Sequence, residues 1–285
     1  MNRIAITAEC VCDLPEKMRQ QYGIDCIYFD IITDEGVFRD TVEISARNVL
    51  EYMNNGRKKV LSHEPTAEQF QKFFTEHLKT CDEIVHISIG DKISKAYPNA
   101  VLARERMGAD AERIHIIDSR QVTTGIGFLL IKAAQMREDG KNAQEIVEGV
   151  LQEIEKISVS FITRDANYLY YNGRASKWVM NLCKKMVLHP VLYVKDGELV
   201  LKTIMIGNYE KACKRYVKKQ LKRKNRIDRE RCFVTYADCS QKQLKQIETV
   251  VRECIDFEHL IFNTASATVS CNCGPNTFGV LYVRS

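Results

Sequence analysis

The sequence predicts an α/β protein with an N-terminal mostly parallel α/β/α domain and a C-terminal α+β domain that contains a mixed or antiparallel sheet. Three observations carry this prediction. Short β-branched runs alternate with helical patterns through the first half of the chain. A hairpin and a closing strand dominate the second half. At 285 residues the chain is also long for one compact core, which favours two domains.

The first half of the chain alternates between strands and helices. Predicted strands cover residues 3–7, 26–32, 83–88 and 113–117, and predicted helices cover 14–22, 45–53, 66–76 and 94–107. Thr66 and Gln69 form a capping-box pattern that marks one helix start. Because helices connect successive strands, we expect a parallel sheet with helices on both faces.

The pattern changes after a helical stretch over 123–157 that is interrupted at Asp139 and Gly140. The later elements are a hairpin turning at Lys195-Asp196-Gly197, a basic helix, a strand, an amphipathic helix and a closing strand, over 187–206, 209–224, 232–237, 240–255 and 278–283. We therefore place the domains at 1–157 and 158–285, with a ligand site expected between them.

Composition indicates a globular protein of a reducing compartment. Hydrophobic residues make up 45% of the chain, and no run approaches the roughly 20 apolar residues that a membrane span needs. The eleven cysteines come without a secretory signal, which favours reduced thiols and a cytoplasmic location.

Positive charge is concentrated in residues 211–231. This window holds eleven Lys and Arg against two acids, so it carries +9 while the rest of the chain sums to −4. The apolar residues in this part of the chain recur at near-helical spacing. This favours a helix that buries its apolar side and leaves its lysines and arginines as a solvated face. A functional patch would suit an acidic protein surface, an anionic membrane or another phosphate-carrying partner, with nucleic acid as the less favoured alternative.

The motifs argue against several classes of enzyme. A phosphate-binding loop and a Gly-x-Ser-x-Gly elbow are both absent from the sequence. Two C-x-C pairs, Cys10 with Cys12 and Cys271 with Cys273, are too closely spaced for a typical zinc site. We predict no catalytic residue, metal or cofactor, although catalysis through Cys271 or Cys273 stays as an alternative.

Two serines lie where an α/β protein can bind an anion. We expect Ser62 and Ser94 to follow the carboxyl ends of parallel strands, where open sheets place ligands and helix N-termini favour negative charge. The alternative is that Ser94 is a helix cap and Ser62 a turn residue. Near the C-terminus, the segment 270–279 is predicted to be a polar turn that aims donors at one point.

These segments also carry a family resemblance. Five of them occur in order along the chain: Asp13-Leu14-Pro15, Ser62-His63-Glu64-Pro65, Ile93-Ser94-Lys95-Ala96-Tyr97, Asn172-Gly173-Arg174-Ala175-Ser176 and Asn272-Cys273-Gly274-Pro275-Asn276. In their order and spacing they resemble the DegV family of fatty-acid-binding proteins.

The resemblance implies a carrier without catalytic activity of its own. Such a carrier binds a long-chain fatty acid in an apolar tunnel and presents the carboxylate to a separate fatty-acid kinase, which forms an acyl phosphate. The carboxylate-binding positions of the family fall here on Ser62, Ser94, Arg174 and Asn272. Accessory positions of the same motifs fall on His63, Lys95, Cys273 and Gly274.

The chain departs from the family pattern at four places. Ala8-Glu9 replaces Asp-Ser, Lys95-Ala96 replaces Gly-Thr, Glu64 replaces Gln, and Asn272 replaces His. Asn272 can donate a hydrogen bond but cannot carry charge. Lys95 is expected either to add a cation near the head group or to be an exposed first-turn residue.

Overall fold

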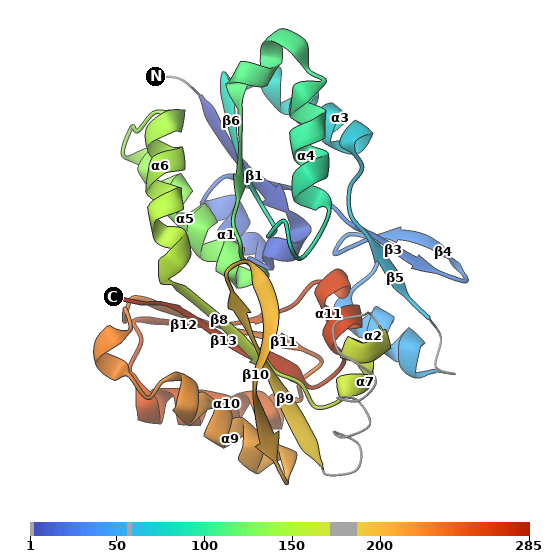
Figure 1. The fold of residues 1–285 in the computed structure, drawn as a ribbon, viewed down its shortest axis with the longest axis vertical. Helices are drawn as coiled ribbons and strands as arrows, with labels where there is room; N and C mark the ends of the chain where they lie inside the picture. The colour runs from blue at the N-terminus through green and yellow to red at the C-terminus, as the bar shows by residue number, and fades with distance from the viewer. Residues whose placement is uncertain (1–2, 56–58, 172–186) are drawn as a thin grey trace.

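The computed structural model describes residues 3–55, 59–171 and 187–285 (Figure 1). Four parallel strands form the sheet of the N-terminal half, in the order β2-β1-β6-β7. They are β1 (Ile4–Glu9), β2 (Ile24–Ile27), β6 (Glu83–Ser88) and β7 (Ile114–Asp118). β1 and β6 are buried along almost their whole length, as expected of parallel strands covered on both faces.

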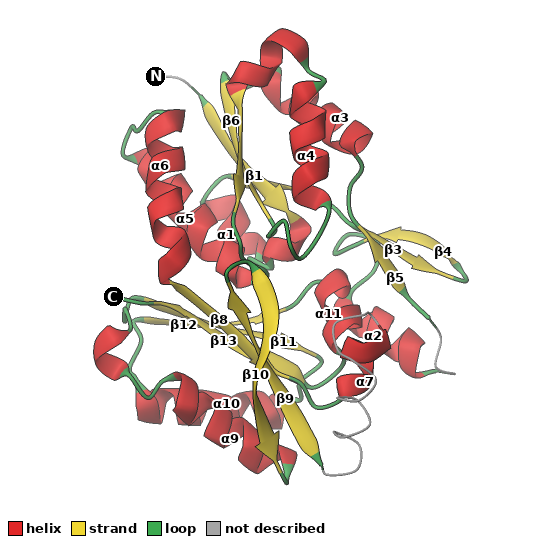
Figure 2. Cartoon of the chain, in the orientation of Figure 1, coloured by secondary structure: helices red, strands yellow, loops and turns green. Residues whose placement is uncertain are grey.

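Helices cover both faces of this sheet, with α3 and α4 on one side and α5 and α6 on the other (Figures 1 and 2). The helices of this half are α1 (Glu16–Gln21), α2 (Ala46–Asn54), α3 (Ala67–Leu78), α4 (Ala96–Glu105), α5 (Thr124–Glu138) and α6 (Ala143–Glu153). The predicted capping box at Thr66 and Gln69 is confirmed, because each side chain accepts a hydrogen bond from the other's backbone N–H.

The predicted strand over 26–32 is wrong, because it is two strands in two sheets. β2 ends at Ile27, and β3 (Asp30–Thr33) pairs antiparallel with β4 (Gly36–Arg39) and β5 (Leu61–His63). This small sheet projects from the side of the molecule (Figure 1). Tyr28 and Phe29 between the two strands continue the apolar pattern, so no glycine or proline signals the break.

The C-terminal half is built on a six-stranded sheet in the order β10-β9-β8-β13-β11-β12, in which β11 and β12 pair in parallel and the other pairs are antiparallel. The strands are β8 (Ile157–Ile162), β9 (Leu188–Lys195), β10 (Glu198–Ile206), β11 (Arg231–Ala237), β12 (His259–Thr264) and β13 (Thr277–Val283). The predicted hairpin is β9 and β10, whereas sequence reasoning missed β8 and β12. β8 begins this sheet beside the predicted boundary at residue 158, and the division into two domains stays a prediction.

The two faces of the six-stranded sheet pack against different parts of the chain. One face packs on α9 (Tyr209–Gln220) and α10 (Gln241–Cys254), where the Tyr216 and Phe278 rings lie 5.4 Å apart. The other face packs against the N-terminal half, where the Phe128 and Phe233 rings lie 5.1 Å apart. The Phe128–Phe233 contact joins this second face to α5.

A short helix, α11 (Ala267–Cys273), lies where the two halves meet (Figure 1). The prediction of a polar turn over 270–279 is therefore wrong in its first residues, because the helix continues to Cys273. The signal was available in Ser266, whose hydroxyl accepts a hydrogen bond from the N–H of Val269 as a helix N-cap. The turn itself begins at Gly274, whose φ of 80° suits glycine.

Two buried carboxylates from the N-terminal half bind the start of α11. Asp13 Oδ1 accepts a hydrogen bond of 2.8 Å from the N–H of Ser266. Asp40 accepts 2.8 Å hydrogen bonds from the N–H groups of Ala267 and Thr268, one on each carboxylate oxygen. The first N–H groups of a helix have no partner within the helix, so these carboxylates stabilise α11 and join the two halves.

One other helix, α7 (Ala166–Tyr171), lies beside α11. Among the helices of the described residues, none is long and apolar enough to cross a membrane.

We predict that Asp40→Ala lowers the free energy of unfolding by about 1–3 kcal/mol, because two buried N–H groups lose their acceptor. Chemical denaturation measures this change. The matched control is Asp139→Ala, at an exposed aspartate that follows α5, with an expected change within about 0.5 kcal/mol. Equal destabilisation by the two variants would contradict the role of Asp40.

Candidate functional site

A cavity of about 620 Å³ lies between the parallel sheet and the six-stranded sheet. Residues from both halves of the chain line it, from Val11 near the N-terminus to Leu281 in β13. Its volume is in the range of small-molecule sites. The cavity stands where the sequence places a ligand site, between the two halves.

Most of the cavity wall is apolar. The apolar lining comes from both halves and includes Val11, Phe29, Leu61, Ile89, Ile93, Val122, Val159, Phe161, Leu199, Val269 and Leu281. Such a wall favours a hydrocarbon chain, because burying apolar surface releases it from water.

Charged and polar side chains also line the cavity, and four of the polar ones come from three separate elements. Ser62 belongs to β5, Ser94 to the loop between β6 and α4, and Thr268 and Asn272 to α11. Ser94 lies beyond the carboxyl end of a parallel strand as predicted. The same prediction for Ser62 is wrong, because Ser62 lies inside β5 of the antiparallel small sheet, opposite Ile31.

The amide of Asn272 organises one side of this polar group. Its Nδ2 donates to the carbonyl oxygen of Thr268 at 2.8 Å and to the hydroxyl oxygen of Ser62 at 3.3 Å, with the sulfur of Cys271 at 3.6 Å. An amide nitrogen has two hydrogens, so its donor capacity is used within the protein. The Ser62 oxygen acts as an acceptor here, and its hydroxyl also interacts with the Cys271 thiol.

Ser94 is held in a similar way. Its hydroxyl oxygen accepts a hydrogen bond of 3.2 Å from the N–H of Ala96, the first residue of α4. Its backbone N–H donates to the carbonyl of Gly90 at 3.1 Å, within the turn that leads from β6. The N-cap of α4 is Lys95, without a side-chain capping hydrogen bond, so Ser94 is a turn residue just before the helix and not the cap that the alternative expects.

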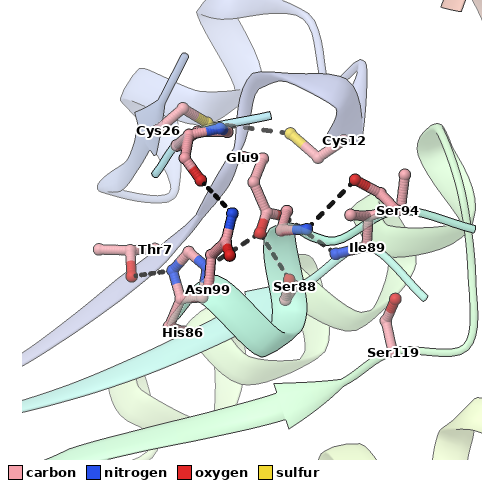
Figure 3. A network of polar contacts seen from close by, with 12 residues as sticks. Thr7, Glu9, Cys12, Cys26, His86, Ser88, Ile89, Ser94, Asn99 and Ser119 are labelled. Atoms are coloured by element: carbon pink, nitrogen blue, oxygen red, sulfur yellow. Dashed lines mark hydrogen bonds and ion pairs between the residues drawn. The ribbon is translucent and has the colours of Figure 1, made fainter. Parts of the chain in front are cut away.

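Glu9 anchors the loop that carries Ser94 (Figure 3). It is fully buried, and its carboxylate accepts hydrogen bonds from the hydroxyl of Ser88 at 2.5 Å and from the N–H of Ile89 at 2.9 Å. His86 Nε2 lies 3.2 Å from the same carboxylate, while Nδ1 lies 3.0 Å from the hydroxyl of Thr7. Sequence reasoning recorded Glu9 only as a departure, although an acid at the end of a buried strand is itself a signal of a buried partner.

The structure separates the predicted accessory residues. Lys95 and Cys273 line the cavity, and Lys95 is exposed. His63 is exposed and does not belong to the lining formed by the described residues. Gly274 is also outside that lining, and a Cβ there would lie 2.4 Å from the ring of Tyr168, so its role is in the backbone.

Arg174, the fourth predicted carboxylate-binding position, lies outside the described residues.

The cysteines beside the cavity are not activated. Burial raises the pKa of Cys271 far above its ordinary value and raises the pKa of Cys273 to about 12. Both thiols are therefore protonated at neutral pH, which argues against the alternative of nucleophilic catalysis. Within the described residues, no cluster of three or more His, Cys, Asp or Glu side chains could hold a metal ion.

The basic segment forms a solvated helix face, as predicted. In α9 the apolar side of the helix is buried, and the lysines point away from it. Some of these cations have partners, since Lys214 lies 3.5 Å from Glu210 and Lys218 lies 3.5 Å from Glu253.

Comparison with known proteins identifies relatives over the whole chain. The family described as "Uncharacterised protein, DegV family" matches residues 3–285. A DegV domain-containing protein of Caldanaerobacter subterraneus is 29% identical over 282 residues, which are 99% of each chain.

Solved structures share the fold. A DegV family protein of Thermus thermophilus, described by its fatty acid binding, superimposes with a TM-score of 0.88 at 20% identity, over 99% of this chain and 100% of that one. The Fatty Acid Kinase B3 protein of Streptococcus pneumoniae, loaded with linoleic acid, gives a TM-score of 0.85 at 20% identity over the same shares. The predicted fold class is confirmed by these similarities.

We predict that Cys271 and Cys273 resist alkylation by iodoacetamide at pH 7. Burial keeps the reagent away from both sulfur atoms, and the raised pKa keeps both thiols protonated. Cys254, half-buried at the end of α10, is the internal control and reacts first. Peptide mass spectrometry after timed alkylation measures the three rates. Rapid, stoichiometric modification of Cys271 or Cys273 in the folded protein would contradict the prediction.

Proposed function

The chain belongs to the DegV family, and we propose from this premise that it binds one long-chain fatty acid in the cavity. The observation that carries the proposal is the combination of a mostly apolar cavity with the polar residues Ser62, Ser94 and Asn272 in its lining, which come from three elements. Relatives described as fatty-acid-binding proteins support it.

The hydrocarbon tail supplies the affinity. Each buried methylene contributes about 0.8 kcal/mol, so fourteen of them contribute roughly 11 kcal/mol before the cost of ordering the chain. The apolar lining from both sheets is the surface that buries them.

The polar group fixes the head. A carboxylate taken partly out of water needs donors to offset its desolvation. Ser62 and Ser94 each have an oxygen that already accepts from an N–H, so each can orient its hydrogen toward the carboxylate. In the family motif, Arg174 is the position that adds a guanidinium to these donors.

We propose further that the protein is a cytoplasmic carrier and leaves the chemistry to a partner. The protonated thiols beside the cavity support the absence of its own nucleophile. The similarity to a Fatty Acid Kinase B3 protein supports a separate fatty-acid kinase, which would phosphorylate the presented carboxylate to an acyl phosphate.

The candidate surface for an anionic partner is the basic segment 211–231, which covers the exposed face of α9 and the residues that follow this helix. Its exposed cations suit an acidic patch on the kinase or an anionic membrane from which the lipid is collected. The alternative of nucleic-acid binding rests on the same charge alone, and steep loss of binding with salt would be its signature.

We predict that Ser62→Ala and Ser94→Ala each weaken binding of palmitic acid by about 10-fold or more, since each removes a hydrogen bond to a charged group. The double variant weakens it further, and fluorescence displacement measures the affinities.

The control for these variants is Thr249→Ala, which removes an exposed hydroxyl from α10, far from the cavity lining. Its affinity is expected to match that of the unmodified protein. Unchanged affinity in both serine variants and in their double would refute the assignment of the carboxylate site.

A further inference from the structure

Two buried thiols of the N-terminal half lie in contact with each other. The sulfur atoms of Cys12 and Cys26 are 3.9 Å apart, and both cysteines are free (Figure 3). Cys12 is the last residue of η1 (Cys10–Cys12), a short 3-10 helix that follows β1, and Cys26 lies in β2. Because a disulfide holds its sulfur atoms about 2.05 Å apart, bonding this pair draws them together by about 2 Å.

A cation lies beside one member of this pair. The guanidinium of Arg19, a half-buried residue of α1, interacts with the Cys26 sulfur. The hydrogen bond from Cys12 and the charge of Arg19 together lower the pKa of the Cys26 thiol despite its burial. The same hydrogen bond and burial raise the pKa of Cys12. Cys26 is therefore suited to attack as a thiolate, with a protonated thiol in contact to resolve the product.

This combination distinguishes Cys26 from the other cysteines. In the part of the chain that the structure describes, the pKa of every other cysteine is raised, and burial contributes each time. Cys26 is 7% exposed, which suits an oxidant of the size of water better than a bulky alkylating reagent. Oxidation is therefore expected to select this pair of thiols.

The segment that carries Cys12 also contributes to the cavity and to the link with α11. Val11, the residue before Cys12, lines the cavity. Asp13, the residue after it, has a φ of 52° and accepts hydrogen bonds from the N–H of Ser266 and from the side-chain amide of Asn263. A residue other than glycine keeps a positive φ only where its surroundings hold it. A shift of Cys12 toward β2 therefore disturbs both of its neighbours.

We propose that Cys12 and Cys26 are a modification site that a hydroperoxide converts to a reversible disulfide, and that this disulfide weakens ligand binding by displacing η1 at the cavity wall. The effect on binding rests on the proposed function, whereas formation of the disulfide does not.

The reaction consumes one hydroperoxide. The Cys26 thiolate attacks one oxygen of the O–O bond and becomes a sulfenic acid, while the departing oxygen takes up the proton that Cys26 has lost. The Cys12 sulfur then attacks the sulfenic sulfur, the S–S bond forms, and the Cys12 proton leaves with the hydroxide as water. Two electrons pass from the two sulfur atoms to the hydroperoxide. A thiol reductant reverses the reaction by thiol–disulfide exchange.

The test exposes the reduced, folded protein to hydrogen peroxide and maps its peptides by mass spectrometry without reduction. Cys12→Ser and Cys26→Ser are the two variants, and dimedone traps any sulfenic acid. Cys81→Ser is the matched control, since Cys81 is a buried cysteine of the same half and its pKa is raised. Palmitic acid affinity is measured by fluorescence displacement before oxidation, after it, and after reduction with dithiothreitol.

The expected product is one linked peptide pair that contains Cys12 and Cys26, in the unmodified protein and in Cys81→Ser alike. Cys12→Ser stops at a dimedone adduct on Cys26, and Cys26→Ser gives neither product. Oxidation weakens palmitic acid binding by about 5-fold or more in the unmodified protein, and reduction restores it.

The proposal is overturned if peroxide leaves both thiols free in the unmodified protein, or if the disulfide forms and the affinity stays the same. A reduced protein that binds no palmitic acid would refute the proposed function and the binding effect with it. The peptide map still decides in that case whether the two thiols form a disulfide.

Discussion

The capping of α11 by two buried carboxylates is the interaction on which the site depends. Asp13 and Asp40 come from the N-terminal half, yet their carboxylate oxygens accept hydrogen bonds from the first N–H groups of a helix in the C-terminal half. Burial raises the pKa of both carboxyl groups, so placing them there is costly. The hydrogen bonds offset part of that cost and fix α11 at the cavity wall.

The fixed helix explains how distant segments form one polar group. α11 carries Thr268 and Asn272, and the amide of Asn272 reaches across to Ser62 in β5. On the other side, Glu9 holds the loop that carries Ser94. The lining of the described residues therefore holds the neutral hydroxyls of Ser62 and Ser94, and it also includes the lysines Lys59, Lys92 and Lys95.

Local patterns predicted much of the fold. The alternating strands and helices, the Thr66 capping box and the hairpin at Gly197 all follow from periodicity and turn chemistry. Sequence reasoning joined β3 to β2 because the apolar pattern continues through Phe29, and it missed β5 because its pairing with β3 is long-range. The β3–β4 hairpin is a local pairing that the analysis did not recognise. β12 lacks a strong turn signal on either side.

The site was predictable in its residue types and only in part in their roles. Motif resemblance indicated Ser62, Ser94 and Asn272, which line the cavity. Whether Asn272 donates to a ligand or to the protein depends on which side chains lie beside it. A single sequence does not show how close Asn272 lies to Ser62 or to other acceptors. The same holds for Glu9, whose role follows from contacts far along the chain.

The most direct test of the central claim is native mass spectrometry of the protein purified without detergent, paired with analysis of the lipid released on denaturation. The account predicts one fatty acid per chain, either co-purified or taken up from a panel of fatty acids. A protein that stays empty in both conditions, or that carries a lipid without a carboxylate head, would contradict it.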